Sequence, residues 1–260
     1  MNNNKSKQLP KEVFEMSAYN IIKAKEKGEG QGAKVKRVFP TQHYPGHHDP
    51  FVLLDEFFVE SPAGFPNHEH RGFEAITYML EGSFLHEDNL GNSSEVQEGG
   101  VQAFNAGKSL VHSEKPGETG YSHGIQLWVN LPREKKKSDP KYQQLKETKL
   151  IKDKNEIKVR KILGEDVPIN LNTEVEYFDV KLKEDVPYQM QIKKGHKGLI
   201  YVINGSLSID NLKVEISEGE ALLFDNLDKV KITSISDTRF IILSGLPLDQ
   251  KIEIRGSFVE

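Results

Sequence analysis

The sequence predicts an all-β protein that contains two similar β-domains. Short runs of β-branched and aromatic residues recur along the chain and are separated by Gly, Asn and Asp, at the intervals that sandwiches and barrels show. A pattern in one half of the chain is echoed in the other half. The 260 residues suffice for two domains, and domains of about 100–130 residues can each bury a core.

Six runs carry the clearest strand signal: FEAITYML (73–80), GIQLWVNL (124–131), EVEYFDVKL (174–182), GLIYVI (198–203), EALLFDN (220–226) and TRFIILSG (238–245). In the second run, alternate residues should face opposite sides of the strand. We expect one set to pack in the core: Ile125, Leu127, Val129 and Leu131. The other set could face a pocket: Gln126, Trp128 and Asn130.

An internal repeat indicates that the domain is duplicated. Residues 78–83, YMLEGS, are echoed by residues 201–206, YVINGS, and each is followed by a glycine turn, EGGV at 98–101 and EGEA at 218–221. The echo ends at the histidines, because only His196 precedes the second copy and no His-x-His occurs there. We therefore expect the second half to be a copy of the β-domain that lacks the histidine pairs of the first half.

Two pairs of potential metal ligands lie in the first half. His68 and His70 are one residue apart, as are His112 and Glu114, and on a strand each pair would point to a single face. Two adjacent strands would bring three imidazoles and a carboxylate together. Glu74, four residues after His70, is an alternative carboxylate that the spacing leaves open. Each pair alone is also compatible with ordinary polar residues, but both occur in the same repeat unit.

Such a set narrows the metal chemistry. The chain has no cysteine, so only imidazole and carboxylate can bind the ion, and disulfides and thiolate catalysis are excluded. Three neutral nitrogens and one carboxylate suit non-haem Fe(II), with Mn, Ni, Cu, Co or Zn as competitors. Open positions on the ion would leave room for a substrate or for dioxygen as co-substrate.

Composition restricts the partners. The formal charge of −4, from 35 basic and 39 acidic residues, gives no reason to expect direct nucleic acid binding or attachment to an anionic membrane. The first residues, MNNNKSKQLPKEVFEM, lack an apolar signal region, and no run is apolar enough to span a bilayer. We expect a cytoplasmic protein, although the sequence does not distinguish the cytoplasm from the nucleus.

One long stretch carries a family resemblance. The run FPNHEHRGFEAITYMLEGSFLHEDNLGNSSEVQEGGVQAFNAGKSLVHSEKP, with DPFVLLDEF before it and HGIQLWVNLP after it, closely resembles the pirin family of the cupin superfamily, and the resemblance extends from about Arg37 to residue 260. It implies a bicupin, two jelly-roll β-barrels in tandem, with one Fe ion in the first. The ligands that match the family are His68, His70, His112 and Glu114.

Composition and the resemblance together give the expected domain boundaries. Residues 1–33 would be an N-terminal extension, 34–135 the cupin domain with the metal site, and 159–260 the cupin domain without one. Residues 136–158, part of a stretch rich in Lys, Asp and Pro, are expected to form a solvated connector.

Two departures from the family pattern bear on the site. Ala103 replaces a tryptophan that the family usually has, so we expect a reshaped wall near the site. Residue 260 falls about where relatives continue into a final helix, so part of the surface they cover is expected to be exposed.

Several further residues are pocket candidates. The resemblance favours Glu114 over Glu74 as the carboxylate ligand and leaves Glu74 as a group that could orient a histidine. His86 and Asp88 are expected near the barrel mouth. His43, His47 and His48 lie in a Gly/Pro-rich stretch, HYPGHHDPF, and are expected in a loop away from the metal.

The resemblance supports two functions. Some pirins are quercetin 2,3-dioxygenases, which implies a small aromatic, flavonol-like substrate whose ring is opened by dioxygen with loss of carbon monoxide, and Glu114 as ligand and base. The alternative is a regulatory protein whose iron state changes its binding to a protein partner such as a transcription factor, without turnover.

Overall fold

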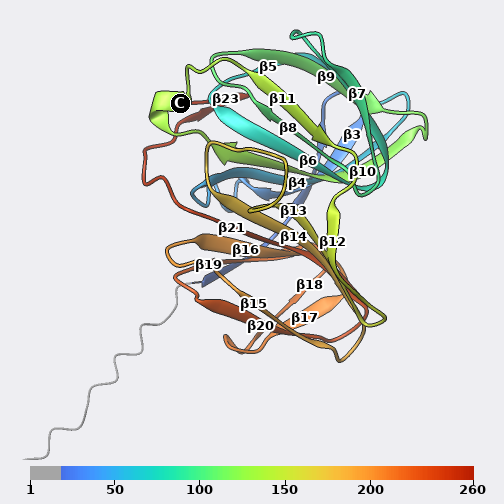
Figure 1. Ribbon diagram of the computed structural model, residues 1–260, viewed down its shortest axis with the longest axis vertical. Coiled ribbons are helices and arrows are strands. Elements are labelled where there is room, and N and C mark those ends of the chain that lie inside the picture. Colours follow the sequence, from blue (N-terminus) through green and yellow to red (C-terminus); the bar gives the residue numbers. More distant parts are fainter. Residues whose placement is uncertain (1–18) are drawn as a thin grey trace, which may run out of the picture.

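A computed structural model describes residues 19–260 of the chain as two β-barrels that pack against each other. The all-β prediction is confirmed, since the only helical element in these residues is one 3₁₀ turn, η1 (Arg133–Lys135). None of residues 19–260 form a helix long and apolar enough to cross a membrane. Figure 1 shows most of the first barrel in blue to yellow-green and most of the second in yellow to red.

The first barrel is formed by one curled sheet of ten strands. In chain order these are β2 (Lys25–Glu29), β3 (Ala33–Phe39), β4 (Phe51–Glu60), β5 (Phe65–His70), β6 (Phe73–Asp88), β7 (Ser93–Gln97), β8 (Val101–Asn105), β9 (Leu110–Pro116), β10 (Tyr121–Asn130) and β11 (Lys141–Leu145). The main path runs β11-β8-β6-β10-β4-β3-β2, while β7 and β9 pair with the far half of β6, and β5 pairs with β9. The pairs are antiparallel, as expected for a jelly roll.

The second barrel is formed by a seven-stranded and a four-stranded sheet. The larger contains β1 (Tyr19–Lys23), β12 (Lys149–Lys154), β13 (Ile157–Leu163), β14 (Val175–Leu182), β16 (Lys197–Asn204), β19 (Glu220–Asp225) and β21 (Thr238–Gly245). The smaller contains β15 (Pro187–Gln191), β17 (Ser206–Ile209), β18 (Val214–Ser217) and β20 (Lys229–Ser234). Two short strands, β22 (Ile254–Arg255) and β23 (Phe258–Val259), follow.

The predicted duplication is confirmed in backbone detail. The glycines of the repeated EGS and NGS sequences, Gly82 and Gly205, both have positive φ, 73° and 84°, which an L side chain rarely adopts. The same two hydrogen bonds form around them in each barrel: Glu98 N to Gly82 O and Gly99 N to Met79 O, then Glu218 N to Gly205 O and Gly219 N to Val202 O. After Gly82, β6 pairs with β7 and β9 instead of β8 and β10, and after Gly205 the chain passes from the larger sheet of the second barrel to the smaller one.

A shared apolar core holds the barrels together. It includes the outward face of the first barrel's main sheet, Ile76, Ile125, Leu127 and Val129, and the matching face of the second, Leu199, Leu223, Ile241 and Leu243. Equivalent tyrosines cross this interface in opposite directions. Tyr78 donates to Asp179 at 2.8 Å, and Tyr201 donates to Glu56 at 2.6 Å, so each buried carboxylate receives a hydroxyl from the other barrel.

The interior of the second barrel is filled by apolar side chains. Eighteen buried hydrophobic residues form one cluster there, among them Phe178, Leu207, Phe224 and Phe240. In residues 19–260, the two groups of three or more His, Asp or Glu side chains close enough to bind one ion both lie in the first barrel. Apolar side chains therefore fill the interior of the second barrel, in the place where the first barrel contains the histidines.

The expected domain boundaries are wrong at both ends and in the middle. The residues expected to form a connector contribute β11 to the first barrel, where it pairs with β8, and β12 to the second, where it pairs with β13. Their polarity reflects edge strands with one solvated side, not a linker. In the expected N-terminal extension, β1 pairs with β19 of the second barrel and β2 with β3 of the first.

The chain returns to the first barrel after β21. We call residues 246–260 the returning segment. A single parallel bridge joins Arg71 to Phe258, and Val259, only 1% exposed, packs among Phe73, Phe104 and Trp128. Figure 1 shows the red β23 against the first barrel. Part of the expected second domain thus belongs to the first.

Candidate metal centre

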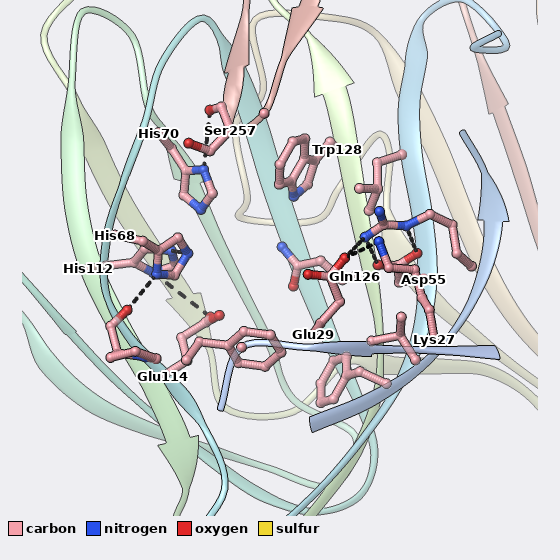
Figure 2. A pocket seen from close by; sticks show the side chains of 18 of the residues that line it. Lys27, Glu29, Asp55, His68, His70, His112, Glu114, Gln126, Trp128 and Ser257 are labelled. Atoms are coloured by element: carbon pink, nitrogen blue, oxygen red, sulfur yellow. Dashed lines mark hydrogen bonds and ion pairs between the residues drawn. The ribbon is translucent and has the colours of Figure 1, made fainter. Parts of the chain in front are cut away.

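A cavity of about 580 Å³ opens inside the first barrel. Figure 2 shows the histidines and Glu114 on one side of it and a group of charged residues on the other, with Gln126 and Trp128 between them. The volume lies in the range of sites for small organic ligands. Of the residues predicted to face a pocket from β10, Gln126 and Trp128 line the cavity, whereas Asn130 accepts a hydrogen bond from Lys136.

The register of β5 and β9 brings the histidines together. His68 lies directly opposite His112 in the antiparallel pair, and His70 follows on the same face of β5 as His68. One ligand nitrogen from each of the three lies within 4.8 Å of the others.

Each histidine has its own partner for Nδ1. In His68 this nitrogen is 2.8 Å from the carbonyl oxygen of Pro66, and in His70 it is 3.4 Å from that of Ser257. A carbonyl only accepts, so Nδ1 carries the proton in both rings. Their Nε2 atoms are therefore left with a free lone pair.

His112 is held by a buried chain of polar groups. His86 Nε2 lies 3.1 Å from a carboxylate oxygen of Asp88, which assigns the proton of His86 to Nε2. His86 Nδ1 can then accept from His112 Nδ1, 3.3 Å away. This leaves Nε2 of His112 deprotonated. His86 was expected near the mouth of the barrel, but it is fully buried behind His112 because its ring stacks on Tyr142.

Burial keeps the three rings neutral. It lowers the pKa of His68, lowers that of His70 to about 3 with a further contribution from neighbouring His68, and lowers that of His112 well below its ordinary value. Neutral imidazoles can bind a metal, whereas imidazolium cannot.

Glu114 lies beside His112 and also lines the cavity. Its carboxylate oxygen is 4.0 Å from His112 Nδ1 and forms a group with His112 and His86, not with all three histidines of the first group. Burial raises the pKa of Glu114 to about 8, and Gln102, which donates to it at 2.7 Å, opposes that rise. Because this pKa lies near neutral pH, the carboxyl group can both take up and release a proton there.

The donor set fits a divalent cation. Nε2 of His68 and Nε2 of His112 face each other at 3.1 Å, and neither carries a proton in the assignment above. Two nitrogens bound at a right angle to one ion, at about 2.1 Å each, lie about 3.0 Å apart. Without an ion, two lone pairs would oppose each other at this distance, so the separation favours a cation shared by the two imidazoles.

Glu74 does not orient a histidine, contrary to expectation. Its carboxylate accepts from the backbone N–H and the side-chain amide of Asn172, at 2.9 Å each, in the second half of the chain. It points to the outer face of β6, while Phe73 on the inner face contacts His70. Burial raises the pKa of Glu74 to about 7.

Ala103 does not lie in the wall near the site. It is buried in the apolar core between the barrels, and its neighbours on β8, Gln102 and Phe104, point toward the histidines. The substitution expected to reshape the pocket therefore affects the contact between barrels.

The loop histidines lie away from the cavity, as the surrounding glycines and prolines predict. His43 is exposed, His47 is half-buried, and His48 is buried with Nε2 2.9 Å from the carbonyl oxygen of Gly198 in the second barrel. None of these three lines the cavity.

Sequence reasoning missed two parts of the cavity. Opposite the histidines, Arg37 donates twice to Asp55, at 2.8 and 2.6 Å, and also contacts Glu29, which pairs with Lys27. The two basic and two acidic side chains of this group have a formal net charge of zero. The sequence shows the alternating charges of KEKGE (25–29) and the acid in VLLDEF (52–57). It does not show that these side chains meet at one wall of the cavity. The returning segment adds Ile254, Gly256 and Ser257.

Known proteins resemble both halves of the chain. The family model "Pirin" matches residues 32–129, and "Pirin C-terminal cupin domain" matches residues 177–260. Pirin from Mus musculus is 35% identical over 92% of this chain and 85% of its own length.

Solved structures share the architecture. A crystal structure of quercetin 2,3-dioxygenase from Acinetobacter baumannii is 26% identical and superposes with a TM-score of 0.85 over 94% of this chain and 92% of that one. The bacterial pirin YhhW from Escherichia coli, in complex with nickel(II), is 23% identical with a TM-score of 0.74, over 88% and 99% of the two chains, a likeness that shows the fold. From the two matched models and the mouse relative, the chain belongs to the pirin family, with two cupin domains.

Proposed function

We propose that the chain is a metal-dependent oxidoreductase of the quercetin 2,3-dioxygenase type, which opens the ring of a flavonol or a related phenol. The observation that carries the proposal is the set of three imidazoles that each place one ring nitrogen within 4.8 Å of the others, at the wall of a cavity with room for a small aromatic molecule. The similarity to the A. baumannii quercetin 2,3-dioxygenase supports this substrate class.

His68, His70 and His112 would hold the ion through Nε2, with Glu114 as the fourth ligand. Fe(II) is the metal we propose, and Mn, Ni, Cu, Co and Zn match the same donors. Such an ion, when bound, supplies the Lewis acidity and one-electron chemistry that oxidation of a phenol by dioxygen requires. In the overall reaction both oxygen atoms of dioxygen enter the products, and one ring carbon leaves as carbon monoxide.

Glu114 is suited to take the phenol proton. A base works best when its pKa lies near the operating pH, and that of Glu114 is raised to about 8 by burial. Gln102 fixes its orientation, and Tyr142 in turn donates to Gln102 at 3.2 Å. The buried pair thus holds a proton acceptor at the cavity wall.

Phe65, Phe84 and Trp128 provide apolar and aromatic surface for the rings of the substrate. Two residues before Trp128 on β10, Gln126 accepts a hydrogen bond from the hydroxyl of Thr77 through its amide oxygen, at 2.6 Å. Its amide nitrogen is left to donate to a substrate oxygen.

The test combines metal content with turnover. Purified protein is loaded with Fe(II), Mn, Ni, Cu or Co and supplied with quercetin in air, while the flavonol absorbance and oxygen uptake are followed. We expect turnover with at least one metal, and loss of bound metal in His68→Ala and His112→Ala. His43→Ala, in the exposed loop, is the matched control.

Absence of turnover with every metal would refute the proposed reaction. Retention of one metal per chain in both histidine variants would refute the ligand assignment. In the first case the regulatory role becomes the hypothesis to test, by comparing the proteins captured by Fe(II)-loaded and Fe(III)-loaded chains.

A further inference from the structure

The returning segment lies beside His70. The Ser257 carbonyl accepts from His70 Nδ1 at 3.4 Å, and Ile254 and Gly256 form the adjoining wall. Figure 2 shows Ser257 next to His70, on the side away from Glu114. The contact joins residues 187 positions apart in the chain.

We propose that residues 254–259 position His70 for metal binding and cover the cavity beside Trp128, so that a segment beyond the second barrel completes the site in the first. The inference rests on the proposed metal site. It assigns to the segment a role in the affinity and geometry of that site.

The argument begins with the Nδ1 partners of the three histidines. His68 uses Pro66, two residues earlier on its own strand, and His112 uses His86 on the neighbouring strand. His70 alone depends on a group from outside the strands of its barrel. Partners of this kind fix the tautomer and the ring orientation of a ligand, and their loss typically weakens metal binding about 10–100-fold.

The segment is anchored next to this contact. Val259 N donates to Arg71 O at 2.9 Å, and Arg71 N lies 3.4 Å from Ser257 O. The Arg71 guanidinium lies over the Phe258 ring, 4.8 Å from its centre. All three contacts involve Arg71, the residue directly after His70, so displacement of the segment would also displace the ligand.

Lys136 adds a charged anchor. Its ammonium group donates to three acceptors: Gly72 O at 2.9 Å, Asn130 Oδ1 at 2.7 Å and Val259 O at 3.1 Å. An ammonium has three N–H donors, so all of them are used here. The cation therefore joins the segment to the turn that follows His70.

The segment also covers aromatic surface. Ile252 and Ile254 pack against the cluster that contains Trp128 and Val259. The rings of Trp128 and His70 are 5.2 Å apart. Trp128 is the only tryptophan of the chain, so tryptophan fluorescence reports on the surroundings of this one side chain.

Three variants loosen the segment: a chain shortened to end at Glu253, and the point variants Phe258→Ala and Lys136→Met. Nickel(II) affinity is measured by competition with a chelator, and the visible spectrum of bound Co(II) reports the ligand geometry. Acrylamide quenching of Trp128 is measured without metal. Arg255→Ala is the matched control, since that side chain is 67% exposed.

We expect the shortened chain to bind nickel(II) about 10–100-fold more weakly, with an altered Co(II) spectrum and stronger quenching of Trp128. Phe258→Ala and Lys136→Met should shift in the same direction, and Phe258→Tyr, which keeps the ring, should restore wild-type binding. The point variants keep the test valid if the shortened chain folds poorly.

Wild-type affinity and Co(II) spectrum in the shortened chain and in Phe258→Ala would overturn the inference, even with Trp128 more exposed. Failure of the wild type to bind nickel(II) or Co(II) would overturn it together with the metal site. Failure of quercetin turnover, with the metal results as expected, would refute only the proposed reaction.

Discussion

Gln102 offers a test of how the site holds its carboxylate. It is fully buried on β8, and its amide donates to Glu114 at 2.7 Å. Gln102→Leu removes this donor and puts an apolar side chain of similar size in its place. Hydrogen bonds to charged groups contribute about 1.5–3 kcal/mol, and about 1.4 kcal/mol corresponds to one pKa unit. The pKa of Glu114, about 8 in the wild type, should rise by about 1–2 units.

The consequence appears in the pH dependence of metal binding. A carboxyl group binds an ion only when deprotonated, so below its pKa each pH unit lowers the affinity by up to about tenfold. Burial lowers the pKa of each of the three histidines, which reduces their own contribution to this pH dependence. We expect wild-type nickel(II) affinity to rise from pH 6 to about pH 8 and then level off, whereas Gln102→Leu should level off about 1–2 pH units higher.

The assay is nickel(II) competition titration from pH 6 to pH 10, with circular dichroism to confirm folding. Gln144→Leu, directly opposite on β11, is the matched control, because its amide donates to the backbone of Glu95. If Gln102→Leu and the wild type share one pH profile, then Glu114 is not a ligand or Gln102 does not stabilise its charged form.

Three further outcomes follow from contacts already described. His86→Leu removes the acceptor of the His112 Nδ1 proton and should weaken nickel(II) binding about tenfold or more; unchanged affinity in titration would contradict the tautomer assignment. Tyr201→Phe removes the hydroxyl that donates to Glu56 and should lower the free energy of unfolding by about 1.5–3 kcal/mol; an unshifted urea midpoint would argue against a contribution of this bond. Ala103→Trp should overpack the core between the barrels and destabilise the protein by about 1–3 kcal/mol or more, while nickel(II) affinity stays at the wild-type value; weaker binding with unchanged stability would place this position at the site after all.

The strands and the duplication could be predicted because their signals are local. Alternating side chains, glycine turns and each copy of the YxxxGS pattern span only a few consecutive residues. The two i, i+2 pairs of potential ligands were visible for the same reason. Their convergence required the register of β5 with β9, which the sequence only suggested.

The faces of β6 and β8 could not be assigned in the same way. The first eight residues of β6 are all buried, because one face lines the barrel interior and the other contacts the second barrel. A strand buried on both sides loses the alternation of polar and apolar residues that reveals its orientation. Glu74 and Ala103 were therefore expected near the metal although both point to the interface.

The returning segment and β1 were unpredictable for a different reason. Each joins a barrel formed by distant parts of the chain, as in the pairing of β1 with β19, about 200 residues later. Short strands such as β22 and β23, of two residues each, have no pattern of their own.

The long-range contact between His70 and Ser257 also affects the order of events during synthesis. A ribosome produces the ligand-bearing strands of the first barrel early, but residues 254–259 emerge only after all of the strands of the second barrel. A nascent first barrel can therefore present its histidines before the wall beside His70 exists. If the segment positions that ligand, the protein binds metal at full affinity only after both barrels have been synthesised. The strands of the second barrel then separate, along the chain, the ligand-bearing strands from the segment that completes their site.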